Sequence, residues 1–291
     1  MGIVIQHELF RHRLHGFICC AIGKNMELNR LIYLLICLFT LGCDNNASFA
    51  QICENYQQAC QEFQQDTWCK KERVQLVFAH VAFANRQGDK EKFNTLMAYE
   101  DYEKCVTNVA GIDHIKFKKK KTKRIENMLK ARHKIELLSN ETVDSNYPSL
   151  LYYHWTHHLN KQSLAKFLAL EGDPIMDNPT SQYELATYYA KQDINKTITL
   201  LYRALELYQV GETINVEIFK SLTSIYAKMG DSKQAYIWLK VLTLAAPKDK
   251  QINHTNLQRY QNNSNLDQRF LDKVARALLE NIKKAKFVAP T

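Results

Sequence analysis

Three histidines stand close together in the sequence and are the first residues whose spacing could support chemistry. His154, His157 and His158 occupy positions i, i+3 and i+4, which on a helix would bring two imidazoles to one metal ion. The carboxylate that zinc hydrolases carry between such histidines is missing from this stretch. The sequence therefore favours a structural or solvated histidine cluster beside Trp155, and we expect no metal ion and no cofactor.

A basic run over residues 116–124 is the second feature with possible chemistry. Its cationic members are Lys116, Lys118, Lys119, Lys120, Lys121, Lys123 and Arg124. Such a run can contact anionic lipid head groups, an acidic partner or nucleic acid. Phe117 is its only aromatic residue, whereas surfaces that bind single strands interleave aromatics with the charges. A solvated helix face is the plainest interpretation, and contact with lipid head groups is the sharpest functional one.

The sequence holds no motif for nucleophilic catalysis or phosphate cradling. Gly-x-Ser-x-Gly, the P-loop and Gly-x-Gly-x-x-Gly are all missing, and only nine glycines are present among 291 residues. We therefore expect no catalytic residue and no enzyme. Glycine and proline are scarce throughout, which argues against β-sandwiches, barrels and doubly wound folds and predicts an all-α protein.

An export signal is predicted at the start of the chain. Arg30 precedes an apolar run over residues 31–41, which is too short to span a bilayer but suits the core of a signal peptide. We assign residues 1–42 to this signal segment and expect Met26 to be the true start. Without residues 1–42 the formal charge falls from +9 to +7, because four basic and two acidic side chains leave with them.

Two cleavage sites remain open. Leu41-Gly42-Cys43 resembles the end of a bacterial lipobox, in which the cysteine is lipidated, although Thr40 and Leu41 depart from its usual residues. Asp44 resembles the retention signal of inner-membrane lipoproteins. The alternatives are cleavage after Ala50, which would release a soluble secreted protein, and an uncleaved anchor. We expect a lipoprotein held on the periplasmic side of a bacterial cell envelope.

Four cysteines remain after the signal once Cys43, which is either lipidated or cut off, is set aside. An even number in an exported chain suggests two disulfides. Residues 69–105 read as two helical arms of equal length around the turn at Gln87-Gly88, so we prefer Cys69 paired with Cys105. The other pair, Cys53 and Cys60, can bridge only if the residues between them break from a helix. A metal site is the alternative, but no Cys-x-x-Cys pair is present.

The mature chain divides into regions by its turn-forming residues. Residues 43–68 are polar, and we expect them to form a tether that contains the first cysteines. We expect residues 69–171 to form an N-terminal helical region. Gly172, Pro174 and Pro179 form the densest group of helix breakers. We expect a repeat region with a C-terminal capping helix over residues 172–291. The apolar stripe predicted for that helix consists of Leu266, Phe270, Leu271, Val274, Leu278 and Ile282.

The repeat region resembles tetratricopeptide (TPR) repeats. The residues that carry this resemblance are Phe219, Leu222, Tyr226, Ala235, Leu239, Leu242 and Pro247. A weaker copy is formed by Leu185, Tyr189, Thr197, Leu201 and Ala204. The arms of residues 69–105 could be a third, degenerate copy. Small side chains at such positions let paired helices approach closely, and neighbouring hairpins then share one core, so a TPR-like solenoid is predicted.

The mature chain also resembles an uncharacterised family of Gram-negative predicted lipoproteins, through residues 150–153, 183–189 and 200–208. That resemblance implies an envelope location and an all-helical fold, and it assigns no catalytic residue. Our leading hypothesis is a helical-repeat scaffold that binds envelope proteins of unknown identity. The alternatives are an envelope enzyme or metal-binding protein centred on residues 154–158, or a cytosolic nucleic-acid-binding protein if the signal is misread.

Overall fold

The described residues form helices joined by turns and irregular segments. The computed structural model describes residues 49–63, 67–112, 118–248, 257–258, 260 and 267–290. Within these ranges it contains α-helices, one short 3-10 helix and no strand, which confirms the all-α class. The chain divides into two units, Met1–Asn55 and Tyr56–Thr291. The signal segment 1–42, Cys43 and Lys116 lie outside the described residues.

The polar stretch expected to be a tether contains two short helices. Helix α3 spans Phe49–Asn55 and helix α4 spans Gln57–Gln61. Between them the backbone leaves the helical region at Tyr56, with φ −123° and ψ 54°. The residues between Cys53 and Cys60 therefore break from a helix, which was the condition for a disulfide between them. Cys53 and Cys60 are disulfide-bonded, as expected.

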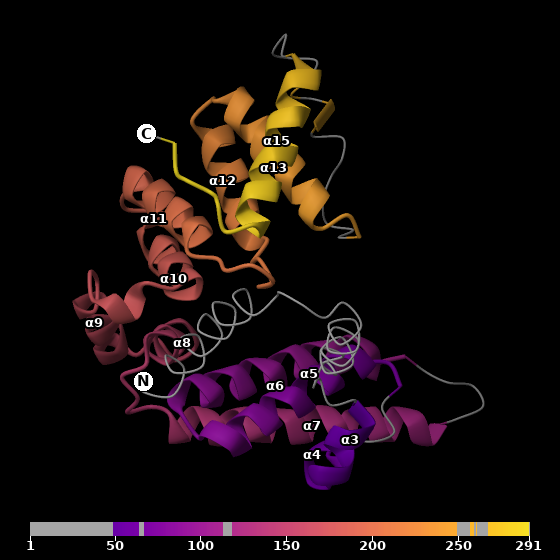
Figure 1. Ribbon diagram of the computed structural model, residues 1–291. Helices are drawn as coiled ribbons and strands as arrows, with labels where there is room; N and C mark the ends of the chain where they lie inside the picture. Colours follow the sequence, from indigo (N-terminus) through magenta and orange to yellow (C-terminus); the bar gives the residue numbers. More distant parts are fainter. Residues whose placement is uncertain are drawn as a thin grey trace, which may run out of the picture. The chain divides into compact units, whose positions relative to one another are not determined.

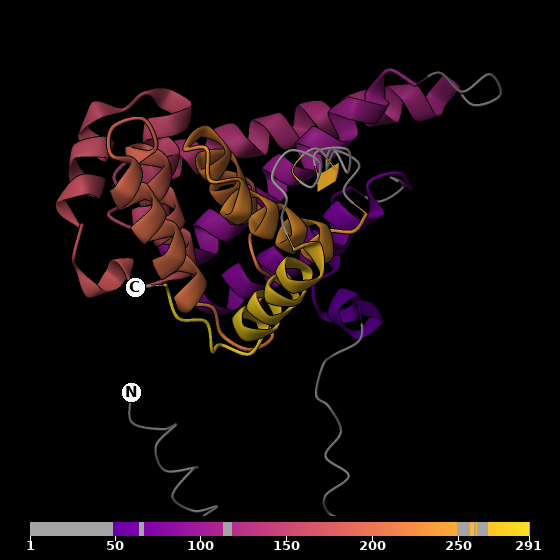
Figure 2. The ribbon, with the colours of Figure 1, turned by 90° about the horizontal axis from the view of Figure 1, so that it is seen from above.

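Three long helices form the N-terminal part of the second unit (Figures 1 and 2). They are α5 (Lys70–Arg86), α6 (Asp89–Ala110) and α7 (Lys118–Glu141), and α6 packs against both neighbours. The turn between α5 and α6 falls at Gln87 and Gly88, as predicted, with Gln87 in the left-handed region at φ 47°. Phe63 joins their core and stacks on Tyr102 with ring centroids 4.3 Å apart.

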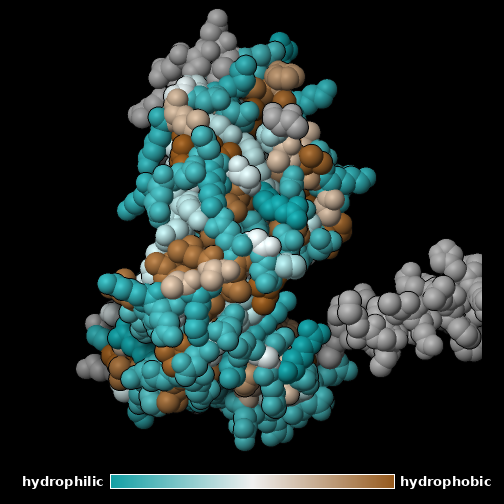
Figure 3. Space-filling model, turned by 90° about the vertical axis from the view of Figure 1, so that its left-hand side faces the viewer, coloured by the Kyte–Doolittle hydropathy of each residue, from teal (hydrophilic) through white to brown (hydrophobic). Residues whose placement is uncertain are grey.

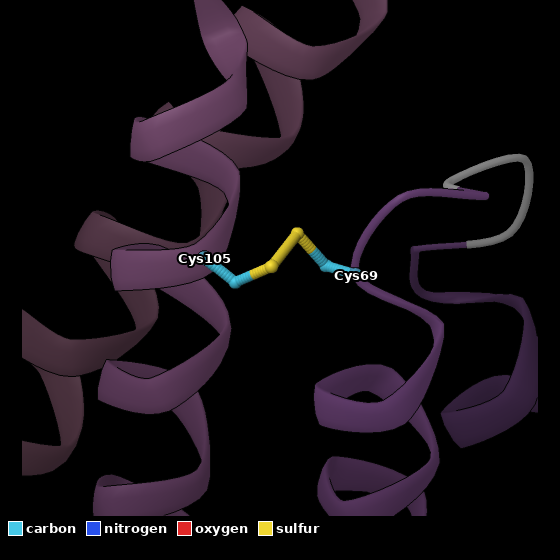
Figure 4. The surroundings of a disulfide bond; sticks show 2 residues. All are labelled: Cys69 and Cys105. Atoms are coloured by element: carbon cyan, nitrogen blue, oxygen red, sulfur yellow. A yellow bond between two sulfur atoms is a disulfide. The ribbon is translucent and has the colours of Figure 1, made fainter. Parts of the chain in front are cut away.

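A disulfide closes the hairpin of α5 and α6. Cys69 precedes α5 and Cys105 lies on α6, and their Cα atoms are 5.9 Å apart (Figure 4). The pairing inferred from the two equal arms is therefore confirmed. Cys69 is fully buried, so the bond belongs to the core of these helices.

Glu62 adds a polar junction to the same helices. Its carboxylate accepts a hydrogen bond from the Tyr99 hydroxyl at 2.8 Å and lies 3.2 Å from Nε2 of His80. Lys130 on α7 donates to the Glu62 carbonyl at 3.1 Å. Burial alone would raise the pKa of Glu62, but the hydrogen bonds from His80 and Tyr99 and the charges of His80 and Lys130 lower it overall.

Shorter helices follow α7. They are α8 (Pro148–His158), α9 (Lys161–Ala169), the 3-10 helix η1 (Pro174–Met176) and α10 (Pro179–Tyr189). Pro148 stands in the first turn of α8, a position that suits proline. The breakers near residue 172 separate α9 from α10: Gly172 has φ 86°, and the Asn178 side chain caps α10 by accepting from the Ser181 amide.

The C-terminal helices share the largest apolar core. They are α11 (Ile194–Glu206), α12 (Glu217–Lys228), α13 (Ser232–Ala245) and α15 (Gln268–Lys283). Helix α10 pairs with α11 and α12 with α13, and α15 packs on α13, as Figure 1 shows. On the face drawn in Figure 3, hydrophilic side chains predominate, which agrees with apolar side chains packed between helices.

The apolar stripe of α15 differs slightly from the predicted one. Leu271 and Ile282 are buried as expected, but Phe270 is 60% exposed. Ala275 and Leu279 take the inner positions between them, so the buried face is rotated relative to the sequence pattern. Leu266 lies outside the described residues.

We predict that the pair of substitutions Cys69→Ser and Cys105→Ser lowers the free energy of unfolding by about 3–4 kcal/mol, because the bond closes a loop with a sequence separation of 36. Urea denaturation followed by circular dichroism measures the change. The matched control, Cys53→Ser with Cys60→Ser, should lose less because its loop is shorter. An unchanged urea midpoint for the first pair would contradict the prediction.

A second prediction concerns the buried carboxyl of Glu184 on α10, which accepts a hydrogen bond from Ser149 on α8 at 3.1 Å. Burial raises its pKa to about 8, and the bond from Ser149 offsets this only in part. The folded protein therefore keeps this proton to a higher pH than the unfolded chain does. Stability should fall as the pH rises from about 5 to about 8, by at most ~1.4 kcal/mol per pH unit.

Glu184→Gln keeps a neutral side chain at every pH, so this contribution to the decline should disappear. Urea denaturation of both proteins across this pH range measures the difference in unfolding free energy, which should move in favour of the variant as the pH rises. Parallel pH profiles would mean that Glu184 titrates normally.

Candidate functional site

A groove lies among α10, α11 and α12 and has a volume of about 350 Å³. Its walls carry hydroxyl, small apolar and basic side chains. They are Ala186, Thr187, Ala190, Ile194, Thr197, Leu201, Lys220, Ser221, Ser224, Ile225 and Lys228. Two lysines and no carboxylate line it, so its charged side chains are cationic.

Capping residues fix the helices around this groove. Asp193 begins α11 by accepting from the Lys196 amide at 2.9 Å, and Asp231 begins α13 by accepting from the Gln234 amide at 2.9 Å. Gly230, at φ 78°, adopts the left-handed conformation that ends α12. Each pair of helices is thus joined by a short turn whose residues suit a tight reversal.

The residues of the predicted repeat lie in the core of the two helix pairs. Phe219, Leu222 and Ala235 are fully buried, and Leu239 and Leu242 are nearly so. The Tyr226 hydroxyl hydrogen-bonds that of Tyr202 on α11 at 2.7 Å, joining one pair to the next. Pro247 follows the end of α13. In the upstream copy, Leu185, Thr197, Leu201 and Ala204 are buried and Tyr189 is half-buried.

A second pocket, of about 620 Å³, is lined by residues of α6, α7 and α8 and includes two of the clustered histidines. His157 stacks on Tyr153 with ring centroids 4.1 Å apart, and its Nε2 lies 3.5 Å from the Glu100 carboxylate. His158 Nε2 lies 2.8 Å from the Ser139 hydroxyl. Each imidazole is therefore held by a different partner.

His154, the third of the cluster, is buried and its Nε2 lies 3.1 Å from the Thr142 hydroxyl. Burial lowers its pKa, and the neighbouring His158 and His157 lower it further. It is thus a neutral, hydrogen-bonded core histidine. Within the described ranges, the group of side chains close enough to share a metal is Cys69, Glu72 and Cys105, but the two sulfurs already form a disulfide.

The basic run forms the start of α7, but its members differ in environment. Lys119 and Lys120 are exposed, whereas Arg124 is only 4% exposed. The guanidinium of Arg124 lies 5.8 Å from the centre of the Trp68 ring. The sequence analysis did not single out Trp68. Its position directly before Cys69 was the available signal, because the disulfide from Cys69 to α6 holds the neighbouring Trp68 near these helices.

These features define an all-helical protein of paired helices that carries a basic groove in its C-terminal half and polar pockets among its N-terminal helices. No helix within the described ranges combines the length and apolar character needed to cross a membrane. Residues 40–240 match the family described as "Protein of unknown function (DUF2989)", and the chain belongs to that family. No curated protein and no solved structure matches the chain.

Proposed function

We propose that this protein is an exported, lipid-anchored envelope protein whose TPR-like helical hairpins bind a segment of another envelope protein. The observation that carries this proposal is the basic groove lined by α10, α11 and α12. Repeats of paired helices commonly bind partners on the surface formed by successive first helices, and α10 and α12 hold that place in the two hairpins.

Close packing within the hairpins supports a TPR-like arrangement. Thr197 and Ala235 are small and buried where paired helices meet, at the position that the repeat pattern assigns to a small residue. Trp238 on α13 stacks on Phe219 of α12 with ring centroids 6.0 Å apart. Helix α15 then covers α13 and serves as the capping helix of the stack.

The partner segment that suits this groove is acidic. Lys220 and Lys228 supply positive charge from α12, with Lys220 also paired to Glu217 at 2.7 Å. Thr187, Ser221 and Ser224 add hydroxyls that can hydrogen-bond a peptide backbone. Complementary charge chiefly gives specificity and fast association, so an acidic segment would be selected over neutral ones.

Export is supported by the disulfides, because such bonds form and persist in oxidising compartments. The anchor itself rests on the sequence around Cys43. In this proposal the signal segment is removed, Cys43 receives lipid, and Asp44 directs the protein to the inner membrane. The helices then face the periplasm, where an envelope partner can reach the groove.

A photo-crosslinking amino acid at Ser224 should couple the groove to an acidic segment of one envelope protein, identified by mass spectrometry. Lys220→Glu with Lys228→Glu should reduce the yield about tenfold or more, because like charges repel. Lys161→Glu with Lys233→Glu changes net charge equally outside the groove and should leave the yield unchanged. No specific crosslink, or equal loss in both variants, would contradict the proposal.

Labelling cells with radioactive palmitate tests the anchor. The protein should carry label, Cys43→Ala should remove it, and the matched control Cys37→Ala, inside the signal segment, should keep it. An unlabelled protein whose first residue is Gln51 would show cleavage after Ala50 instead. Recovery in the cytosol with salt-sensitive nucleic-acid binding would overturn the export proposal altogether.

A further inference from the structure

A small pocket at the start of α7 holds buried donor groups that lack acceptors. It has a volume of about 190 Å³. Its walls are Thr67 and Trp68, which precede α5, and Lys119, Lys120, Lys123, Arg124 and Asn127 of α7. The pocket is distinct from the groove of α10–α12, so an inference about it does not depend on the proposed function of that groove.

Arg124 and Asn127 are the central residues of this pocket, with 4% and 3% of their surfaces exposed. One guanidinium nitrogen of Arg124, Nη2, donates to the carbonyl of Ile112. Its Nε and Nη1, and the amide nitrogen of Asn127, are buried without a hydrogen-bond partner in the described chain. Buried donors without acceptors destabilise the folded state, and charged donors do so more strongly.

The charge around these donors is strongly positive. Lys119, Lys120 and Lys123 line the same small pocket, and Lys123 also pairs with Glu126 at 3.3 Å. The first turn of α7 holds no acidic residue. Cations at a helix N-terminus are repelled by the positive end of the helix dipole. An anion bound there would be stabilised by the cations and by the dipole.

Trp68 forms one wall of the pocket. Its ring is half exposed and lies 5.8 Å from the centre of the Arg124 guanidinium. Because Trp68 directly precedes Cys69, the disulfide to Cys105 restricts where this wall can lie. The pocket is thus built by two segments that are far apart in the sequence, and the disulfide fixes the first of them to α6.

We propose that this pocket binds a phosphate group. Arg124 and Asn127 donate to different oxygens of the anion, and the three lysines neutralise its charge. A tetrahedral phosphate offers more acceptor oxygens and more negative charge than a carboxylate, and so matches donors from two side chains beside three lysines. The phosphate can belong to a lipid head group or to a small soluble ligand, and both present the same chemistry here.

The first arm of the test uses inorganic phosphate with the full chain. Phosphate should raise the melting temperature of the wild type, because ligand binding stabilises the folded state. Calorimetry should show at least about tenfold weaker binding for Arg124→Met. The control Arg132→Gln, on the same helix but paired with Glu103, should bind like the wild type.

Arg124→Met also removes a buried charge, so its melting temperature without phosphate reports whether it folds. If it does not fold, Lys123→Gln, which changes an exposed side chain, serves instead and should weaken binding severalfold. Absence of any phosphate effect on the wild type, or equal binding by Arg124→Met, would overturn the proposal.

The second arm identifies the source of the phosphate. Vesicles containing phosphatidylglycerol are compared with pure phosphatidylcholine vesicles in a flotation assay. If the ligand is a lipid, anionic vesicles bind the wild type, inorganic phosphate competes, and Arg124→Met loses binding. If the ligand is soluble, Arg124→Met leaves vesicle binding unchanged while phosphate binding in the first arm is lost. Both results support the pocket and separate its two sources.

Discussion

The covalent bond between Cys69 and Cys105 holds the beginning of α5 against α6, and much of the N-terminal region is organised around it. Phe63 packs on Tyr102 within the same core. Glu62 then joins α5, α6 and α7, because its carboxylate contacts His80 and Tyr99 and its backbone carbonyl accepts from Lys130. Because the bond also limits the position of Trp68, the same constraint that stabilises the core shapes the pocket beside the basic run.

The elements that sequence could predict are those set by local rules. The reversal at Gln87 and Gly88 and the caps at Asp193 and Asp231 follow from residue preferences that act over a few positions. The polar stretch before Cys69 was harder to interpret, because Phe63 reaches a core formed by residues far along the chain. Phe270 shows the same limit, since a helical stripe does not fix which of its members meets the neighbouring helix.

The candidate sites were predictable only in part, for a related reason. A run of cations looks uniform in sequence, yet Arg124 is buried while Lys119 stays in solvent. That difference depends on the direction in which α7 faces its neighbours. The spacing of the histidines could bring two imidazoles to one metal ion, although the sequence favoured a structural or solvated cluster. In the structure His154 and His158 lie beside separate hydroxyls, those of Thr142 and Ser139. The spacing of the histidines along one helix therefore predicted that their side chains lie close together, but not which groups they hydrogen-bond.

The order of the cysteines has a consequence for how the chain matures. Counted after Cys43, the first cysteine pairs with the second and the third with the fourth, and no cysteine follows Cys105 in the remaining sequence. If the chain is exported as proposed, an oxidase that joined thiols in the order of their emergence from a translocation channel would form the native pairs directly. Such a chain needs no thiol–disulfide exchange to correct its bonds. Its covalent framework would be complete before α10–α13 had left the channel, so the groove could fold onto a finished N-terminal half.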